Sequence, residues 1–156
     1  MTSKIQESRI VITDTSCLIL LAKIDALDIL PKLFASILTT PEIANEYGKT
    51  LPDWITIQSV DQTSKNKFIQ YVDDGEASAI ALAFETYCDY LIIDDMAGRK
   101  LAQKLGLPVK GTVGVLLLAK QYGIIPLLKP YLELIQKTNF RLSQSLAEQF
   151  KKDAGE

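Results

Sequence analysis

Acidic side chains follow two short apolar runs in this sequence. Asp14 comes directly after residues 10–13, and Asp94 and Asp95 come directly after residues 90–93. If both runs are parallel strands, their carboxyl ends share one crevice and the three carboxylates lie close together. Clustered carboxylates repel one another, and a divalent cation removes that repulsion. Two such ions about 3.5–4 Å apart can activate a water and stabilise the leaving oxygen of a phosphodiester.

Further acids can reach the same edge. Glu76 begins the apolar helix predicted over residues 76–87, and Glu42 and Glu46 share one face of the helix that starts at Pro41. Each acid also has a structural interpretation, as a helix cap or as a partner of a helix dipole. Glu42 fits that interpretation better than Glu46 does. The convergence of several acids on one sheet edge favours a metal site.

The composition limits which metal such a site can hold. The 156 residues include no histidine, which excludes histidine catalysis and the common zinc and copper sites. Oxygen ligands remain, and they suit Mg²⁺ or Mn²⁺. The net charge is -2, so contact with a polyanion needs a local basic patch or bridging metal ions.

The expected environment is cytoplasmic. The two cysteines, Cys17 and Cys88, lie in apolar stretches and are expected to be reduced core thiols. No apolar run is long enough to span a bilayer, so no membrane contact is expected. Residues 1–9 are polar and lack the apolar region of a signal peptide.

Apolar runs alternate with helical patterns along the chain. Strands are predicted at residues 9–14, 36–39, 54–58, 90–93 and 107–109, with the third near a sheet edge. Helices are predicted at residues 17–23, 25–34, 41–47, 63–72, 76–87, 96–105 and 113–122. Alternation with fully apolar central strands predicts a parallel α/β sheet covered on both faces. Residues 1–156 are expected to form one domain, with a helical C-terminal tail at about 126–152 that is split near residues 138–139.

The order and spacing of these segments resemble those of the PIN-domain nucleases, in a PIN-like prokaryotic subfamily. The resemblance rests on IVITDTS at residues 10–16, PEIANE at 41–46, DGEASAIA at 74–81 and LIIDD at 91–95. It extends through residues 98–99, 106–112 and 139–143, and therefore covers almost the whole chain. The family implies a three-layer fold, with strand order 3-2-1-4-5 and helices on both faces.

The resemblance also implies a function, namely RNA cleavage that depends on Mg²⁺ or Mn²⁺. Many relatives are toxins of toxin–antitoxin pairs, so RNA is the implied substrate and an antitoxin protein an implied partner. The positions that match the family's acids and its small hydroxyl residue are Asp14, Glu46, Glu76, Asp94 or Asp95, and Ser16. Relatives often have Thr/Ser-Asn-Asp where this chain has Ile93-Asp94-Asp95, which leaves the last ligand open. Asp94 is preferred because it directly ends the strand.

Further expectations concern a group of basic residues, Thr112 and two apolar helices. A basic cluster is expected either to bind the RNA backbone or to form a solvated helix face; it comprises Arg99, Lys100, Lys104 and Lys110. Thr112 is expected to bond a water or a phosphate oxygen. The apolar helices at 113–119 and 124–134 pack into the core, or else form a homodimer surface or an antitoxin groove.

The residues leave one alternative function open and argue against another. The alternative to a ribonuclease is a non-catalytic PIN-like scaffold that binds RNA or protein. A phosphotransfer domain of similar architecture does not fit Asp14-Thr15-Ser16, because it needs paired acids or Asp-x-Asp after the first strand.

Overall fold

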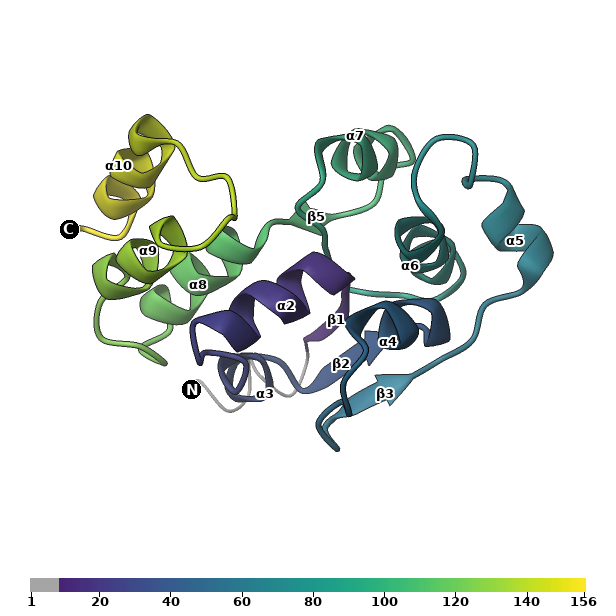
Figure 1. The fold of residues 1–156 in the computed structure, drawn as a ribbon, viewed down its shortest axis with the longest axis horizontal. Coiled ribbons are helices and arrows are strands. Elements are labelled where there is room, and N and C mark those ends of the chain that lie inside the picture. The colour runs from purple at the N-terminus through teal and green to yellow at the C-terminus, as the bar shows by residue number, and fades with distance from the viewer. Residues whose placement is uncertain (1–8) are drawn as a thin grey trace.

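Five parallel strands form the centre of the molecule, and they run in the order β3-β2-β1-β4-β5. The computed structural model describes residues 9–156 (Figure 1). The strands are β1 (Ile10–Thr13), β2 (Ser36–Thr39), β3 (Ile55–Ile57), β4 (Tyr90–Ile92) and β5 (Val109–Lys110). The predicted α/β class, the strand order and the place of the third strand at an edge are confirmed. The prediction that the chain begins without a signal segment concerns residues 1–8 and lies outside the described residues.

Helices flank this sheet in the sequence order that a parallel topology requires. Between β1 and β3 lie α2 (Thr15–Lys23), α3 (Ile29–Leu33) and α4 (Pro41–Tyr47). Between β3 and β5 lie α5 (Gln62–Asn66), α6 (Asp74–Glu85) and α7 (Met96–Lys104). The chain continues with α8 (Thr112–Gln121), α9 (Lys129–Gln136) and α10 (Gln144–Asp153), which lie together at one end of the molecule (Figure 1).

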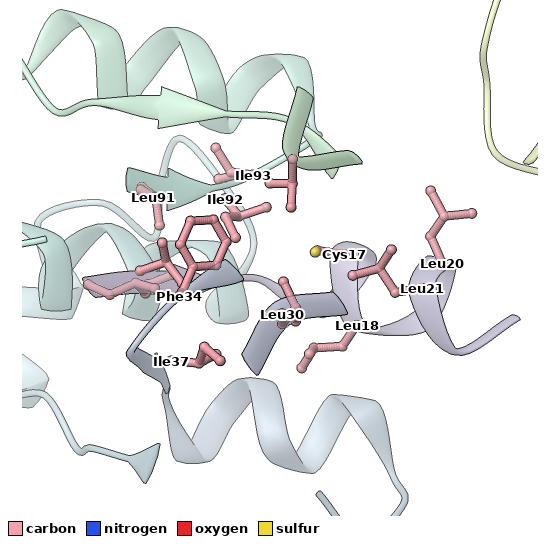
Figure 2. Close-up of a cluster of buried hydrophobic side chains, with 14 of the residues drawn as sticks. Cys17, Leu18, Leu20, Leu21, Leu30, Phe34, Ile37, Leu91, Ile92 and Ile93 are labelled. Carbon is pink, nitrogen blue, oxygen red and sulfur yellow. The ribbon is translucent and has the colours of Figure 1, made fainter. Parts of the chain in front are cut away.

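Both faces of the central strands are covered. Val11 and Ile12 are adjacent in β1 and point to opposite faces, yet both are fully buried. Leu91 and Ile92 are buried in the same way in β4. Figure 2 shows Leu91 and Ile92 beside Phe34, with Leu30 of α3 and Leu18 of α2 in the same buried cluster. Burial on both faces explains why the strands are continuous apolar runs rather than alternating ones.

The strand register brings the ends of β1 and β4 to the same level. Thr13 pairs with Ile92, and the N–H of Asp14 donates to the carbonyl of Ile92 over 3.1 Å. Asp14 directly follows β1, and Asp94 comes two residues after the end of β4, so the two acids emerge close together. The sheet itself creates the crevice in which the acids were expected to meet.

Several predicted boundaries differ from the structure, and the helix predicted over residues 25–34 is the shorter α3 at Ile29–Leu33. The helix predicted over residues 63–72 ends at Asn66, and turns follow because the buried Phe68 packs edge-on against Phe84, with 6.3 Å between ring centroids. The helix predicted to begin at Glu76 begins at Asp74, because the Asp73 carboxylate accepts from the N–H of Glu76 and caps it. The last strand lies at Val109–Lys110, slightly later than predicted.

The C-terminal tail is two helices, as predicted, and a carboxylate fixes it to the body. Glu156 accepts from the N–H groups of Leu128 and Lys129 at 2.6 and 2.8 Å, at the start of α9. Lys120 of α8 donates to the carbonyl of Ala154 over 2.7 Å. Most apolar residues of α8 are buried in the core, whereas Leu134 of α9 is 41% exposed. Within residues 9–156, no helix is both long and apolar enough to cross a membrane.

Candidate functional site

Asp14 is the most buried acid of the crevice, with 2% of its surface exposed. One carboxylate oxygen accepts from the N–H of Cys17 at 2.9 Å and caps α2, and the other accepts from the N–H of Asp94 at 3.3 Å. Burial raises the pKa of Asp14 well above its usual value, and the negative charges of Asp94 and Glu76 raise it further. Asp14 is therefore both a helix cap and a carboxylate that gains from a nearby cation.

Asp94 lies beside Asp14, and Thr112 holds it in place. The N–H of Thr112 donates to one oxygen of Asp94 at 2.9 Å, and the Thr112 hydroxyl donates to the other. Burial raises the pKa of Asp94, while the bonds from Thr112 and the charge of Arg99 oppose that rise. Thr112 is fully buried and orients Asp94 in the structure, so the expectation that it bonds a water or phosphate is replaced by this role.

Glu46 reaches the crevice from the last turn of α4. Its carboxylate accepts from the hydroxyl of Thr15 at 2.9 Å. The helix ends two residues later at Gly48, whose φ of 74° is a left-handed conformation that favours glycine. Gly75 lies against this carboxylate so closely that a Cβ at residue 75 would overlap the Glu46 Oε1 atom. Glycine at position 75 therefore leaves the space that the Glu46 side chain occupies.

Gly75→Ala is expected to separate stability from activity. Alanine favours the helix by about 1 kcal/mol over glycine, and the atom it displaces is the free end of a side chain. We therefore expect an unchanged or higher melting temperature and a loss of about tenfold or more in any activity that needs Glu46. The matched control is the same substitution in a Glu46→Ala background, where it should have no further effect. A further loss there would show that Gly75 acts by another route.

Glu76, in the first turn of α6, and Asp95, which precedes α7, also lie near the crevice. The pKa of Glu76 is raised to about 7, first by burial and then by the charges of Asp73, Asp95 and Glu46. Asp95 accepts from the N–H of Gly98 at 3.1 Å and caps α7. Asp94 thus contacts Asp14, whereas the charge of Asp95 raises the pKa of Glu76, so both aspartates after β4 belong to the acidic cluster.

A cleft of about 230 Å³ lies beside Asp14, Glu46 and Glu76, whereas Asp94 and Asp95 do not line it. It is lined by Asp14, Thr15, Ser16, Ile19, Glu46, Asp73 and Glu76. Ser16 is exposed there in the first turn of α2, as its predicted role requires. Thr15 and Asp73 also line the cleft, although the sequence analysis does not predict them as site residues. In the sequence they could be recognised only by their positions at the starts of α2 and α6.

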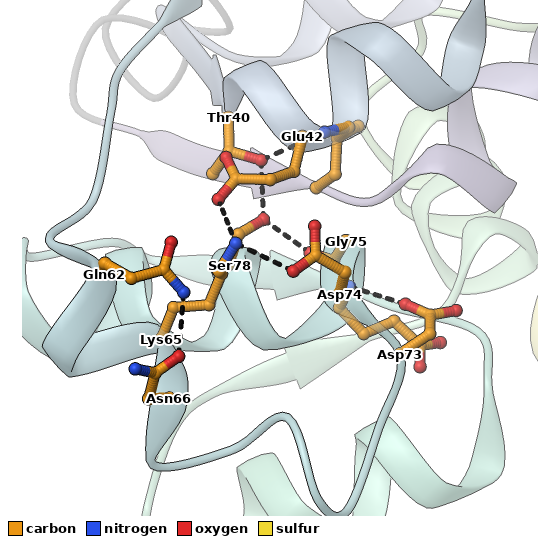
Figure 3. Close-up of polar contacts among 11 residues, drawn as sticks. Thr40, Glu42, Gln62, Lys65, Asn66, Asp73, Asp74, Gly75 and Ser78 are labelled. Carbon is orange, nitrogen blue, oxygen red and sulfur yellow. Dashed lines mark hydrogen bonds and ion pairs between the residues drawn. The ribbon is translucent and has the colours of Figure 1, made fainter.

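A buried polar network fixes α4 relative to α6. The hydroxyls of Thr40 and Ser78 are 2.7 Å apart, and Ser78 also donates to the carbonyl of Gly75 at 2.6 Å. Lys65 of α5 lies between Glu42 and Asp74, with N–O distances of 3.0 and 2.7 Å (Figure 3). Glu42 thus has a structural role, as its position suggested. These contacts hold the helices that carry Glu46 and Glu76.

Lys65→Met is expected to destabilise the fold. The lysine side chain is only 8% exposed, and its loss leaves the largely buried carboxylate of Glu42 without a partner. Because Asp74 is exposed and can be solvated, we expect a loss of about 2 kcal/mol, or a fall of about 6 °C in melting temperature. Lys67→Met, at an exposed lysine two residues away, is the matched control. Equal melting temperatures for the two variants would contradict a supporting role for Lys65.

The predicted basic cluster does not act as a unit. Arg99 donates to the carbonyl of Ile93 at 3.3 Å, and the Lys110 Nζ atom lies 4.7 Å from the centre of the Tyr90 ring. Lys100 and Lys104 are exposed on α7. Only Arg99 and Lys110 border the region next to Asp94.

The chemistry of the crevice fits a hard divalent cation. All its candidate donors are oxygens, and within residues 9–156 no lysine or arginine forms an ion pair with Asp14, Glu46, Glu76 or the two aspartates after β4. In the same residues, no three acidic or thiol side chains already converge at metal-binding distance. Mg²⁺ keeps several waters when bound, so some of these carboxylates can act through water or after a side-chain rotation.

A comparison with protein-family models identifies the fold family. A family model described as a PIN domain matches residues 10–156. The chain belongs to the PIN-domain family. The match begins at β1 and includes every strand of the sheet and every acid of the cleft, so the PIN-domain assignment covers the whole candidate site. Neither the search of curated proteins nor the search of solved structures gave a match.

The PIN domain is generally a nuclease fold, and the acidic cleft of this chain lies where its two central strands end. The family assignment supports a nuclease-type protein in general terms.

Proposed function

We propose that this protein is a metal-dependent endoribonuclease that hydrolyses RNA phosphodiester bonds. The observation that carries the proposal is the buried carboxylate of Asp14, which shares a crevice with several other acids and, within residues 9–156, forms no ion pair with a basic side chain. A protein keeps such a group at a cost in free energy, and a bound cation removes that cost. The PIN-domain family supplies the reaction class.

The proposed site uses the chain's own groups as follows. Asp14, Glu46 and Glu76, with Asp94 and Asp95, would hold Mg²⁺ or Mn²⁺. When bound, the ion supplies activation of a water and stabilisation of charge on the phosphoryl oxygens. The Ser16 hydroxyl lies in the first turn of α2 and can donate to a phosphate oxygen.

The proposed reaction is a hydrolysis with defined products. A water oxygen forms a bond to phosphorus while the bond from phosphorus to the 3′-oxygen breaks. The 3′-oxygen takes up a proton, so the products carry a 5′-phosphate and a 3′-hydroxyl. No ribose 2′-oxygen takes part, which distinguishes this route from metal-independent cleavage through a cyclic phosphate.

End-labelled RNA tests the proposal. We expect cleavage in Mg²⁺ or Mn²⁺, none in excess EDTA, and products that a 5′-phosphate-dependent exonuclease degrades. Cleavage that persists in EDTA, or 2′,3′-cyclic phosphate ends, would contradict the proposed chemistry.

A second candidate is a non-catalytic PIN-like scaffold that binds RNA or protein. One observation favours it: both oxygens of Asp94 are already bonded to Thr112, and no three acids converge within the described residues. Calorimetric titration with Mn²⁺ separates the two candidates. Binding at millimolar Mn²⁺ that is lost in Glu76→Gln supports the nuclease, and no binding supports the scaffold.

The biological setting is part of the proposal. We propose a cytoplasmic toxin that is neutralised by an antitoxin protein, with the whole chain acting as one domain, because buried residues from β1 to α9 belong to one cluster. Two free, buried cysteines fit a reducing compartment.

Induced expression should arrest growth, and co-expression of a small neighbouring gene should relieve the arrest. Sedimentation equilibrium tests the possible homodimer.

A further inference from the structure

A second and larger cavity lies next to the acidic cleft. It has a volume of about 560 Å³ and lies between α8 and the segment from Phe140 to Phe150. That segment includes the first turns of α10, which packs against α8. We call this cavity the α8–α10 groove. Cavities of this size hold small ligands in many proteins.

The walls of the groove are mostly apolar. α8 contributes Val113, Leu117 and Leu118, and the opposite wall contributes Phe140 and Leu146 among others. Leu146 is 47% exposed although it is a large apolar residue in an amphipathic helix. An apolar and partly aromatic wall suits a flat ring that must leave water.

Most charged residues that line the groove are cationic. Among residues 9–156, the cationic residues that line it are Arg99, Lys110 and Arg141, and the one acid is Asp94. Arg99 already contacts a carbonyl, and Lys110 lies over a tyrosine ring. Arg141 is exposed and forms no ion pair or hydrogen bond within residues 9–156. The preferred occupant is therefore an anion that also carries an apolar ring.

Asp94 connects the groove to the acidic cleft. Its residue lines the groove, and its backbone N–H donates to the Asp14 carboxylate. Gly111 stands at the same junction, where an added Cβ would lie 3.0 Å from the Asp94 Oδ1 atom and 2.8 Å from Arg99. An RNA strand with one phosphate at the acidic cleft can therefore continue into the groove.

We propose that the α8–α10 groove binds one nucleotide of the RNA strand next to the cleaved phosphate. The base would lie against the apolar wall near Phe140, and Arg141 would contact a backbone phosphate. Aromatic contact alone tolerates any base, whereas the limited volume of the groove, about 560 Å³, favours bases that fit it. The groove would then set the sequence preference of cleavage on one side of the cut. This inference rests on the proposed ribonuclease function.

The groove is formed before any ligand arrives. The carboxylate of Glu156 and the side chain of Lys120 fix the end of α10 to α8 and α9, as described above. Ser143 caps α10 by accepting from the N–H of Leu146 at 3.1 Å. A wall that is already ordered lowers the entropy cost of binding.

Binding is tested without metal or activity, by NMR titration of the full chain with AMP, GMP, CMP and UMP. We expect saturable shifts at the amides of Gly111, Gly114 and Arg141, with a different affinity for each base. Arg141→Ala should weaken binding about fivefold, and Leu146→Glu, which places a negative charge in the groove, about tenfold or more. Leu134→Glu is the matched control, because Leu134 is similarly exposed but lies outside the groove.

Several outcomes would overturn the inference. These are no shifts at millimolar nucleotide, shifts confined to the acidic cleft, or equal weakening by Leu146→Glu and Leu134→Glu. Shifts in the groove with an acidic amphipathic peptide but with no nucleotide would assign the groove to a protein partner instead.

Cleavage mapping on a random-sequence RNA pool separates this inference from the proposed function. If the protein cuts RNA and Leu146→Glu leaves its base preference unchanged, the function stands and the groove inference fails. If the groove binds nucleotides but no RNA is cut, the ribonuclease proposal fails and the nucleotide site is retained. Altered preference in Leu146→Glu but not in Leu134→Glu supports both.

Discussion

Asp14→Asn is expected to lower metal-dependent RNA cleavage by about a thousandfold or more, with no loss of fold. Asparagine keeps the shape of the side chain, and its oxygen can still accept from the N–H of Cys17 and cap α2. It removes the negative charge that a divalent ion needs at the centre of the crevice. A thousandfold loss corresponds to about 4 kcal/mol of transition-state stabilisation, a reasonable value for a central metal ligand.

The stability of this variant provides the second measurement. The substitution loses the bond from the N–H of Asp94, worth about 1 kcal/mol, and removes a buried charge whose ionisation is unfavourable. We therefore expect the metal-free variant to melt at or above the wild-type temperature at pH 8. Asp28→Asn, at an exposed acid paired with Lys32, is the matched control for cleavage and should retain activity. Cleavage by Asp14→Asn at the wild-type rate would contradict the proposed site.

The metal-free protein is expected to lose stability as the pH rises from 5 to 8. The folded pKa of Glu76 is about 7, above the ordinary value of 4.5, so the folded state binds its proton more tightly than the unfolded state does. The contribution of Glu76 to the free energy of unfolding is therefore greatest below about pH 4.5 and is lost as the pH rises through 7. Allowing for partial exposure of Glu76, we expect a loss of about 2 kcal/mol from this group. Asp14 and Asp94 act in the same direction.

Divalent cations should reverse this loss. At a concentration of 100 times its dissociation constant, a bound ion adds about 2.7 kcal/mol to stability, or about 8 °C in melting temperature. Because the ion binds ionised carboxylates, the increase with Mn²⁺ should be much larger at pH 8 than at pH 5. Differential scanning calorimetry at the two pH values measures both effects.

Two glutamate-to-glutamine substitutions in α6 provide the control for this prediction. Glu76→Gln should flatten the pH dependence and reduce the Mn²⁺ effect, whereas Glu85→Gln, at an exposed residue of α6, should change neither. Stability that rises between pH 5 and 8 without metal would show that the acids are not held at raised pKa values.

The sheet and the position of the main acids were predictable from the sequence, because local patterns carry them. Continuous apolar runs identify central strands, and the residue after each run must lie at the carboxyl edge. This logic places Asp14 and Asp94 correctly. The helix predicted over residues 63–72 was too long, because the packing of Phe68 on Phe84 ends α5 early, and that contact depends on tertiary structure.

Other parts of the site depend on contacts between distant segments, and no local pattern reveals them. Gly75 resembles an ordinary glycine at the start of a helix. In the structure, however, its missing side chain leaves space for the carboxylate of Glu46, a residue 29 positions earlier in α4. Thr112 appeared available for a ligand, but it holds Asp94 instead. The α8–α10 groove forms only when α10 packs beside α8, so its apolar and basic residues appear unrelated in the sequence.

The central claim is that these carboxylates hold a divalent cation, and a crystal soaked in Mn²⁺ tests it most directly. We predict an anomalous difference peak in the crevice, with ligand distances of about 2.0–2.2 Å to Asp14 and to at least one other acid among Glu46, Glu76, Asp94 and Asp95. Asp14→Asn crystals under the same conditions should lack the peak. A wild-type crystal in millimolar Mn²⁺ with no peak at Asp14, or with peaks only elsewhere on the surface, would contradict the account.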